Sequence, residues 1–136
     1  MDRKLQEKLY KKYPKIFKQK DDSIKGSAMP WGLEFGSGWY ILIDNLCSCI
    51  QNYLDNNKHL NMSQVETTQT KEKFGGLRFY HTGGDERVGG MVWFAERMSY
   101  SICEECGSTD NVYQTKGGWI RTLCTPCINK EKKNGK

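Results

Sequence analysis

The sequence predicts an α+β fold in which a small antiparallel sheet or hairpin packs with two to three helices, followed by a C-terminal zinc ribbon or knuckle. Two observations predict it. Over residues 1–102, segments with helical apolar spacing alternate with segments rich in Val, Thr and aromatic residues. Two CxxC motifs then lie within residues 103–129, which we expect to pack on the α+β core. Residues 130–136 are charged and are expected to form a disordered tail.

Apolar spacing and helix breakers place the first elements. Leu5, Leu9 and Tyr13 recur at intervals of four residues and predict an amphipathic helix that ends at Pro14. Residues 31–35 predict a short strand. Ser37 is expected to cap a central buried helix over residues 39–54. The expected inner face of that helix consists of Leu42, Leu46, Cys49, Ile50, Tyr53 and Leu54.

A β-hairpin is predicted next, from a Thr-rich strand over residues 64–72 to a second strand over residues 77–81. Its register has two alternatives. A three-residue turn would place Glu72 opposite Arg78, which is a favourable cross-strand pair. An even-numbered turn would instead put Lys71, Lys73 and Arg78 on one face as a cationic cluster.

The last helix of the core is expected to begin after Asp85, as its cap, and to end near Ser101. Its expected inner face consists of Val88, Met91, Val92, Ala95 and Met98.

The cysteine spacing carries the strongest chemical signal. Cys103 and Cys106 form one CxxC motif, Cys124 and Cys127 form another, and seventeen residues separate the two pairs. Each CxxC loop lets two sulfurs reach one tetrahedral metal, so we expect one Zn²⁺ with four thiolate ligands. Such a zinc has no open position for substrate, and its expected role is structural. Disulfides are the alternative, but the start of the sequence has no apolar run resembling a secretory signal, so a reducing cytosol is expected.

Two further cysteines, Cys47 and Cys49, lie two residues apart within the predicted central helix, so their thiols point to different sides. We expect ordinary burial for them rather than a second metal site.

Composition and motifs limit the function classes. No segment approaches about 18 consecutive apolar residues, so no membrane span is expected. The net charge is +5, and its excess lies in residues 1–25, which suits either an anionic partner or a solvated helix face. His59 and His81 stand outside any HExxH motif, and Walker and dinucleotide glycine patterns are absent.

The hairpin is the candidate binding site because it gathers cations, glycines and aromatic residues within ten positions. Arg and Lys can hold a phosphate, glycines allow close backbone approach, and an aromatic ring can stack on a base. The alternative is that the aromatic residues belong to the core and the cations line a solvated face. The candidate residues are Lys71, Lys73, Gly75, Gly76, Arg78, Tyr80 and Trp39.

Several motifs are distinctive in combination. The longest is Lys71-Glu-Lys-Phe-Gly-Gly-Leu-Arg-Phe-Tyr80, and the others are Lys12-Tyr-Pro followed by Phe17, Trp31-Gly-Leu-Glu-Phe-Gly-Ser-Gly-Trp39, Ser99-Tyr100, Cys103-Glu-Glu-Cys-Gly107, and Gly118-Trp119 before Leu123-Cys124. Together they resemble a family of small, functionally uncharacterised proteins encoded by bacteriophages and prophages. The resemblance spans nearly the whole chain, and the motif from Lys71 to Tyr80 is its most specific part. The resemblance implies a viral origin and a bacterial cytosol, and it carries no catalytic residues across.

The leading functional hypothesis is a non-enzymatic phage accessory protein that binds and blocks a host component. The component would be a defence protein or a nucleotide-type signal that the protein sequesters. Small accessory phage proteins often act as antagonists of host defence, which is an argument by association. A nucleic-acid-binding zinc protein is the alternative, and an enzyme with an unrecognised site comes third.

Overall fold

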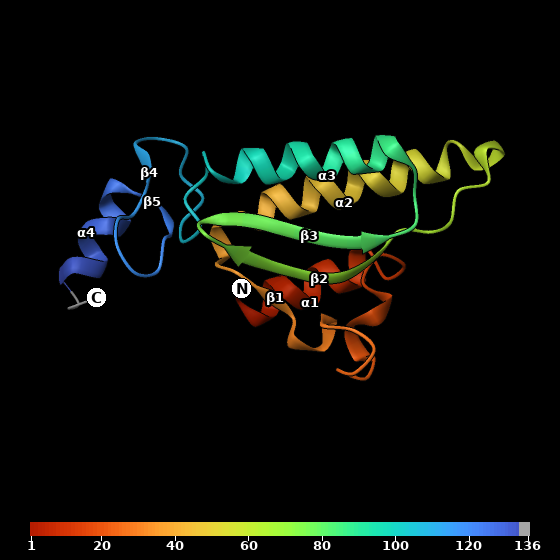
Figure 1. Ribbon diagram of the computed structural model, residues 1–136, viewed down its shortest axis with the longest axis horizontal. Helices are drawn as coiled ribbons and strands as arrows, with labels where there is room; N and C mark the ends of the chain where they lie inside the picture. The colour runs from red at the N-terminus through yellow and green to blue at the C-terminus, as the bar shows by residue number, and fades with distance from the viewer. Residues whose placement is uncertain (134–136) are drawn as a thin grey trace.

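The computed structural model describes residues 1–133 and confirms the predicted α+β class (Figure 1). A three-stranded sheet with order β1-β2-β3 lies in the core, and a two-stranded β4-β5 ladder lies near the C-terminal end. The α-helices are α1 (Arg3–Lys12), α2 (Tyr40–Asp55), α3 (Glu86–Ser99) and α4 (Thr125–Lys133). The strands are β1 (Leu33–Glu34), β2 (Glu66–Lys73), β3 (Gly76–Thr82), β4 (Val112–Gln114) and β5 (Thr122–Cys124).

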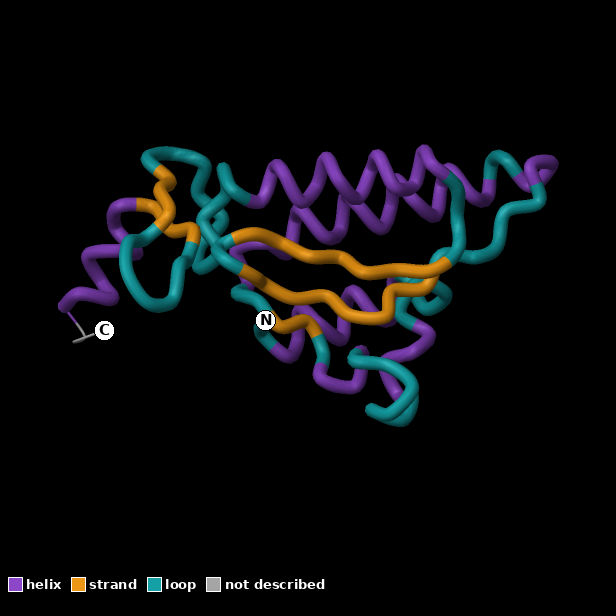
Figure 2. The backbone as a smooth tube through the Cα atoms, viewed as in Figure 1, coloured by secondary structure: helices purple, strands orange, loops and turns teal. Residues whose placement is uncertain are grey.

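The sheet combines the predicted antiparallel hairpin with one short parallel strand (Figure 2). β2 pairs with β3 antiparallel, whereas β1 pairs with β2 parallel and places Leu33 beside Thr70. The sequence indicated the strand at residues 31–35 but not its parallel pairing. A strand of two residues depends on its neighbour for its direction, and that neighbour lies more than thirty positions away in the sequence.

The hairpin turn has two residues, Phe74 and Gly75, and both have positive φ, at 53° and 84°. Positive φ at both central positions is the geometry of a type I′ turn, which matches the twist of the flanking strands. The register therefore pairs Lys71 with Arg78, as the even-numbered alternative requires, and Glu72 faces Leu77. Lys71, Lys73 and Arg78 consequently share one face of the sheet.

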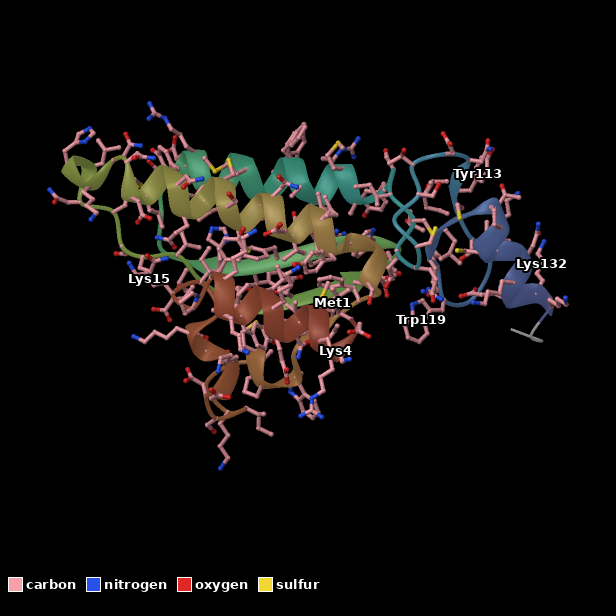
Figure 3. All side chains as sticks on the ribbon, turned by 180° about the vertical axis from the view of Figure 1, so that it is seen from behind. Met1, Lys4, Lys15, Tyr113, Trp119 and Lys132 are labelled. Atoms are coloured by element: carbon pink, nitrogen blue, oxygen red, sulfur yellow. The ribbon has the colours of Figure 1, made fainter. Side chains whose placement is uncertain are left out.

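The opposite face of the hairpin forms the core. Leu77 and Phe79 are buried there, and α1 and α2 cover this side of the sheet, as Figure 3 shows from behind. The main cluster is completed by large side chains from the N-terminal half of the chain: Leu9, Ile16, Phe17, Met29, Trp39, Ile43 and Ile50. In Figure 1 the other face of the hairpin is turned to the viewer with no helix in front of it.

The central helix differs from expectation at its start and on its buried face. Ser37 caps no helix; its Oγ instead accepts a hydrogen bond from the Asp2 amide at 2.8 Å. A 3-10 turn over Ser37–Trp39 leads directly into α2. Cys49, expected inside, is exposed, and Leu42 and Tyr53 are half-buried. The helix buries Ile43, Leu46, Cys47, Ile50 and Leu54.

The α2 pattern was ambiguous because three apolar residues, Ile41, Leu42 and Ile43, follow one another at its first turn. Periodicity alone does not select among neighbouring faces in such a run. The structure selects the face that contains Ile43 and Cys47, and burial raises the pKa of the Cys47 thiol strongly. Cys47 and Cys49 point to different sides of the helix, as predicted.

Helix α3 is capped as predicted and covers the free edge of β3. Asp85 accepts hydrogen bonds from the amides of Arg87 and Val88, at 3.0 and 3.3 Å. On the inner face Val88, Val92 and Ala95 are buried as predicted, together with Ser99, whereas Met91 is only partly buried and Met98 is 39% exposed.

The edge of β3 needs partners because no strand pairs with it in the described part of the chain. The Leu77 amide donates to Ser99 Oγ at 2.9 Å, and the Phe79 amide donates to Glu96 Oε2 at 3.0 Å. Two side chains of α3 thus accept the hydrogen bonds that the backbone of a neighbouring strand would otherwise accept.

The C-terminal end corrects one expectation. Residues 130–133, expected to belong to a disordered tail, continue α4, and residues 134–136 lie outside the described part of the chain. Among residues 1–133, no helix combines the length and apolar character that crossing a bilayer requires.

Candidate metal centre and the hairpin face

The structure brings the four predicted ligands together. The sulfurs of Cys103, Cys106, Cys124 and Cys127 all lie within 4.8 Å of one another. The Cys106 and Cys124 sulfurs are 3.6 Å apart. Four sulfurs bound tetrahedrally at about 2.3 Å from one metal would be about 3.8 Å apart. The cluster therefore has the dimensions of a four-thiolate site that could hold one metal ion.

The local backbone explains how the thiols converge. The first CxxC loop closes with the Gly107 amide donating to the Cys103 carbonyl at 2.8 Å, and Gly107 has a φ of 82°. The second motif begins at the end of β5, where Cys124 pairs with Val112 of β4. We call residues 103–127 the cysteine knuckle; it lies at one end of the long axis of the molecule (Figure 1).

The electrostatics of the cluster suit a thiolate ligand. Burial alone would raise the pKa of the Cys103 thiol, but hydrogen bonds from the amides of Cys106, Cys124 and Glu105 lower it to about 7. The pKa of Cys127 is raised by burial and by the neighbouring thiols. Crowded thiols that cannot all ionise together are relieved when a cation binds among them.

The Gly-Ser-Gly segment before α2 docks the knuckle on the core through direct backbone contact. The Gly38 amide donates to the Glu104 carbonyl at 2.7 Å. A Cβ at Gly38 would lie 2.1 Å from the Cys103 carbonyl oxygen, and one at Gly36 would lie 2.4 Å from the Glu104 carbonyl oxygen. Glycine is therefore required at both positions by the close approach of the knuckle.

Within the glycine pair of the hairpin, Gly75 meets the knuckle and Gly76 meets Tyr100, the residue that follows α3. Thr122 Oγ1 donates to the Gly75 carbonyl at 2.6 Å. A Cβ at Gly76 would lie 2.3 Å from the Tyr100 hydroxyl oxygen. Gly75 and Gly76 are buried, so the backbone approach that they allow is used by this chain itself. Our expectation that both glycines admit an external ligand was wrong for this reason.

The Glu104 side chain links the knuckle to the core, and an ion pair with Arg121 inside the knuckle holds it in place. The Glu104 side chain is 6% exposed, accepts a hydrogen bond from the Gly36 amide at 2.9 Å and lies 3.6 Å from Arg121 Nε. Burial raises the pKa of Glu104, and the nearby Arg121 guanidinium opposes that rise. Arg121 also forms ion pairs with Glu105 and Glu131, so it joins the first CxxC loop to α4.

A cleft of about 990 Å³ opens between this ion pair and the hairpin. Glu72 lies at its edge, where it accepts hydrogen bonds from the Gly75 amide at 2.7 Å and from Trp119 Nε1 at 3.0 Å. Trp119 is 78% exposed and, as labelled in Figure 3, lies where the knuckle meets the core. These contacts occupy Glu72, so it is not the partner of Arg78.

The open face of the hairpin carries four of the predicted binding residues: Lys71, Lys73, Arg78 and Tyr80. Tyr80 is 43% exposed. Arg78 donates a hydrogen bond to the Leu77 carbonyl at 2.9 Å and a second one to the Tyr100 hydroxyl at 3.5 Å. The hydrogen bond with Tyr100 raises the pKa of Arg78. Within residues 1–133, none of the three cations forms an ion pair with an acidic side chain.

Trp39 does not belong to this face. It is fully buried, and its Nε1 donates to the Ile102 carbonyl at 2.9 Å, so its expected role as an aromatic recognition surface was wrong. The sequence around Trp39, a large aromatic residue that follows a glycine, does not indicate whether the side chain is buried or exposed. Three other tryptophans are exposed: Trp31, Trp93 and Trp119.

Searches of protein-family models, of curated proteins and of solved structures found no match to this chain.

Proposed function

We propose that this chain is a zinc-stabilised, non-enzymatic binding protein that captures a host protein by binding an acidic surface of that host protein. The phage resemblance supports an accessory protein of the bacterial cytosol that blocks a defence component. The open face of the hairpin would make the contact. The observation that carries the proposal is the set of three cations on that face, all without an acidic partner in the described residues.

Zinc is the metal that best suits the cysteine cluster. Four thiolates prefer a borderline-soft cation with tetrahedral geometry, and a zinc site made of four cysteines leaves no open coordination position. A zinc there would stabilise the fold. It would also hold Thr122 and Trp119 against the hairpin turn, and so keep the cationic face rigid. A preorganised face loses less conformational entropy when it binds a partner.

The shape of the face favours a macromolecule over a small nucleotide. Ligand sites for small molecules are concave and enclose most of the ligand. Lys71, Lys73, Arg78 and Tyr80 line neither of the two clefts described, of about 990 and 840 Å³. We therefore place the capture of a host protein ahead of the sequestration of a nucleotide signal.

Nucleic acid is the second candidate because Tyr80 lies on the same exposed face as the three cations. An aromatic ring on an open sheet can stack on an unpaired base while Lys and Arg contact phosphates. Such binding weakens steeply as salt rises, because neutralised phosphates release counterions.

The proposal can be tested by affinity capture from a bacterial lysate, with the wild-type chain compared with a Lys71→Ala/Arg78→Ala variant. We expect the wild type to retain a specific host protein and the variant to lose it. Lys11→Ala is a matched control, since Lys11 is an exposed cation on α1. Equal capture by all three chains would contradict the proposed face. If no protein were captured and a single-stranded oligonucleotide bound in a salt-sensitive way, nucleic acid would replace a host protein as the proposed ligand.

A further inference from the structure

The outward face of α3 carries exposed apolar side chains that no other element of the described chain covers. Trp93 and Phe94 are both 62% exposed, and Met98 is 39% exposed. Beside them a groove of about 840 Å³ runs between α2 and α3, and Ile41 on its α2 side is 65% exposed. Scattered exposed apolar residues are ordinary, but a contiguous set of this kind marks an interaction surface.

We propose that this face binds a second copy of the chain, with α3 antiparallel to α3 of the other copy. The two-fold axis would pass between Met91 and Val92. This inference is independent of the hairpin face and its partner. It rests on the order of residues along α3, which is self-complementary in charge and in size about that point.

The outermost line of α3 consists of Glu86, Gly90, Trp93 and Arg97, all of them exposed. Their spacing of four, three and four residues is that of a helix–helix contact line. In an antiparallel two-fold pair, each residue faces the one that lies equally far from the centre. Glu86 then faces Arg97 of the second copy, and Gly90 faces Trp93 of the second copy.

The charges at the two ends of this line are available for such a contact. Glu86 and Arg97 form no ion pair within residues 1–133. Two-fold symmetry would create two Glu86–Arg97 pairs, one at each end of the interface. A parallel arrangement would instead place like charges together, so the charges select the antiparallel direction.

The glycines explain the centre of the line. Gly89 and Gly90 stand in the interior of α3, where glycine is unfavourable relative to alanine. Neither has positive φ, and a Cβ at either position would meet nothing within 4 Å. Nothing within the described chain therefore requires glycine at these positions. A second copy would, because the indole of its Trp93 could lie directly on the exposed backbone at Gly89 and Gly90.

Sedimentation equilibrium of the purified full chain tests the proposal, and we expect a reversible monomer–dimer equilibrium. Glu86→Arg and Arg97→Glu should each weaken the dimer about tenfold or more, because each turns two attractions into two repulsions. The double variant Glu86→Arg/Arg97→Glu should restore dimerisation, because it re-forms both pairs with exchanged signs. Lys11→Glu, an exposed charge reversal on α1, is the control and should leave the equilibrium unchanged.

Two further variants distinguish effects on dimerisation from effects on the stability of α3 in the monomer. Trp93→Ala should weaken the dimer about 30-fold or more, as is usual for a central aromatic contact. Gly90→Ala should raise the melting temperature of the monomer at low concentration and yet weaken the dimer. A chain that remains monomeric at several hundred micromolar would overturn the proposal. The proposal would also be overturned if the double charge variant dimerised no more strongly than the single variants, provided that circular dichroism shows all of them to be folded like the wild type.

Discussion

Gly38→Ala probes the docking of the cysteine knuckle more directly than any other single change. The new Cβ would lie 2.1 Å from the Cys103 carbonyl oxygen and 2.6 Å from the Glu104 carbonyl oxygen. Both contacts are with backbone, so no flexible side chain can move aside. The φ of Gly38 is not in the left-handed region, and alanine therefore adds a steric clash without backbone strain.

The expected loss follows from two terms. Overpacking of a close contact typically costs about 1–3 kcal/mol. Separation of the two backbones also breaks the hydrogen bond from the Gly38 amide to the Glu104 carbonyl, which is 2.7 Å long and contributes about 1 kcal/mol. We expect the variant to lose about 2–4 kcal/mol of its free energy of unfolding, a large fraction of the roughly 5–15 kcal/mol that domains possess. The melting temperature should fall by about 10 °C.

Urea denaturation of wild type, Gly38→Ala and Gly26→Ala measures this effect. Gly26 is the matched control, since a Cβ there would lie 3.7 Å from the Ser23 carbonyl oxygen, an ordinary contact. Gly38→Ala should also weaken metal binding, because the clash displaces the Cys103 backbone. A variant within about 0.5 kcal/mol of wild type would refute the close backbone docking of the knuckle.

Three further predictions follow from the contacts around the site and the core. Glu104→Ala should lower the free energy of unfolding by about 1–3 kcal/mol in urea denaturation, because it leaves the Gly36 amide unpaired; Glu105→Ala, which removes an exposed acid, should have little effect. Partial burial opposes ionisation of Asp44, but hydrogen bonds from Tyr13 and Lys12 hold its pKa below the usual value. Its stabilisation should therefore be complete above about pH 4 and be lost as pH falls further, and Asp44→Asn should lose less stability between pH 5 and about pH 2 than wild type does. Arg78→Ala should weaken partner binding by about 1–3 kcal/mol in a titration at unchanged melting temperature; a lower melting temperature with unchanged binding would make Arg78 a structural partner of Tyr100.

Local signals in the sequence predicted much of the fold. The apolar spacing of α1, the Asp85 cap of α3 and the strand–turn–strand pattern of the hairpin are each encoded within a few neighbouring residues. The CxxC spacing predicted the cysteine cluster for the same reason, since each loop contains two of its ligands.

The functions of the glycine motifs could not be predicted because they depend on contacts between distant segments. Gly38 meets Glu104, and Gly75 meets Thr122, across 66 and 47 positions of the sequence. A local pattern indicates that backbone must approach backbone, but not which backbone it is. Part of the predicted binding motif therefore proved to be the surface on which the knuckle docks. Only its alternate residues, including Lys71 and Arg78, face outward.

Metal analysis of protein purified without chelator tests the central claim most directly. Four converging thiols should hold about one zinc per chain, measured by inductively coupled plasma mass spectrometry. A zinc content near zero in folded protein would contradict the account, because the cysteine knuckle would then keep its structure without the metal that we propose it binds.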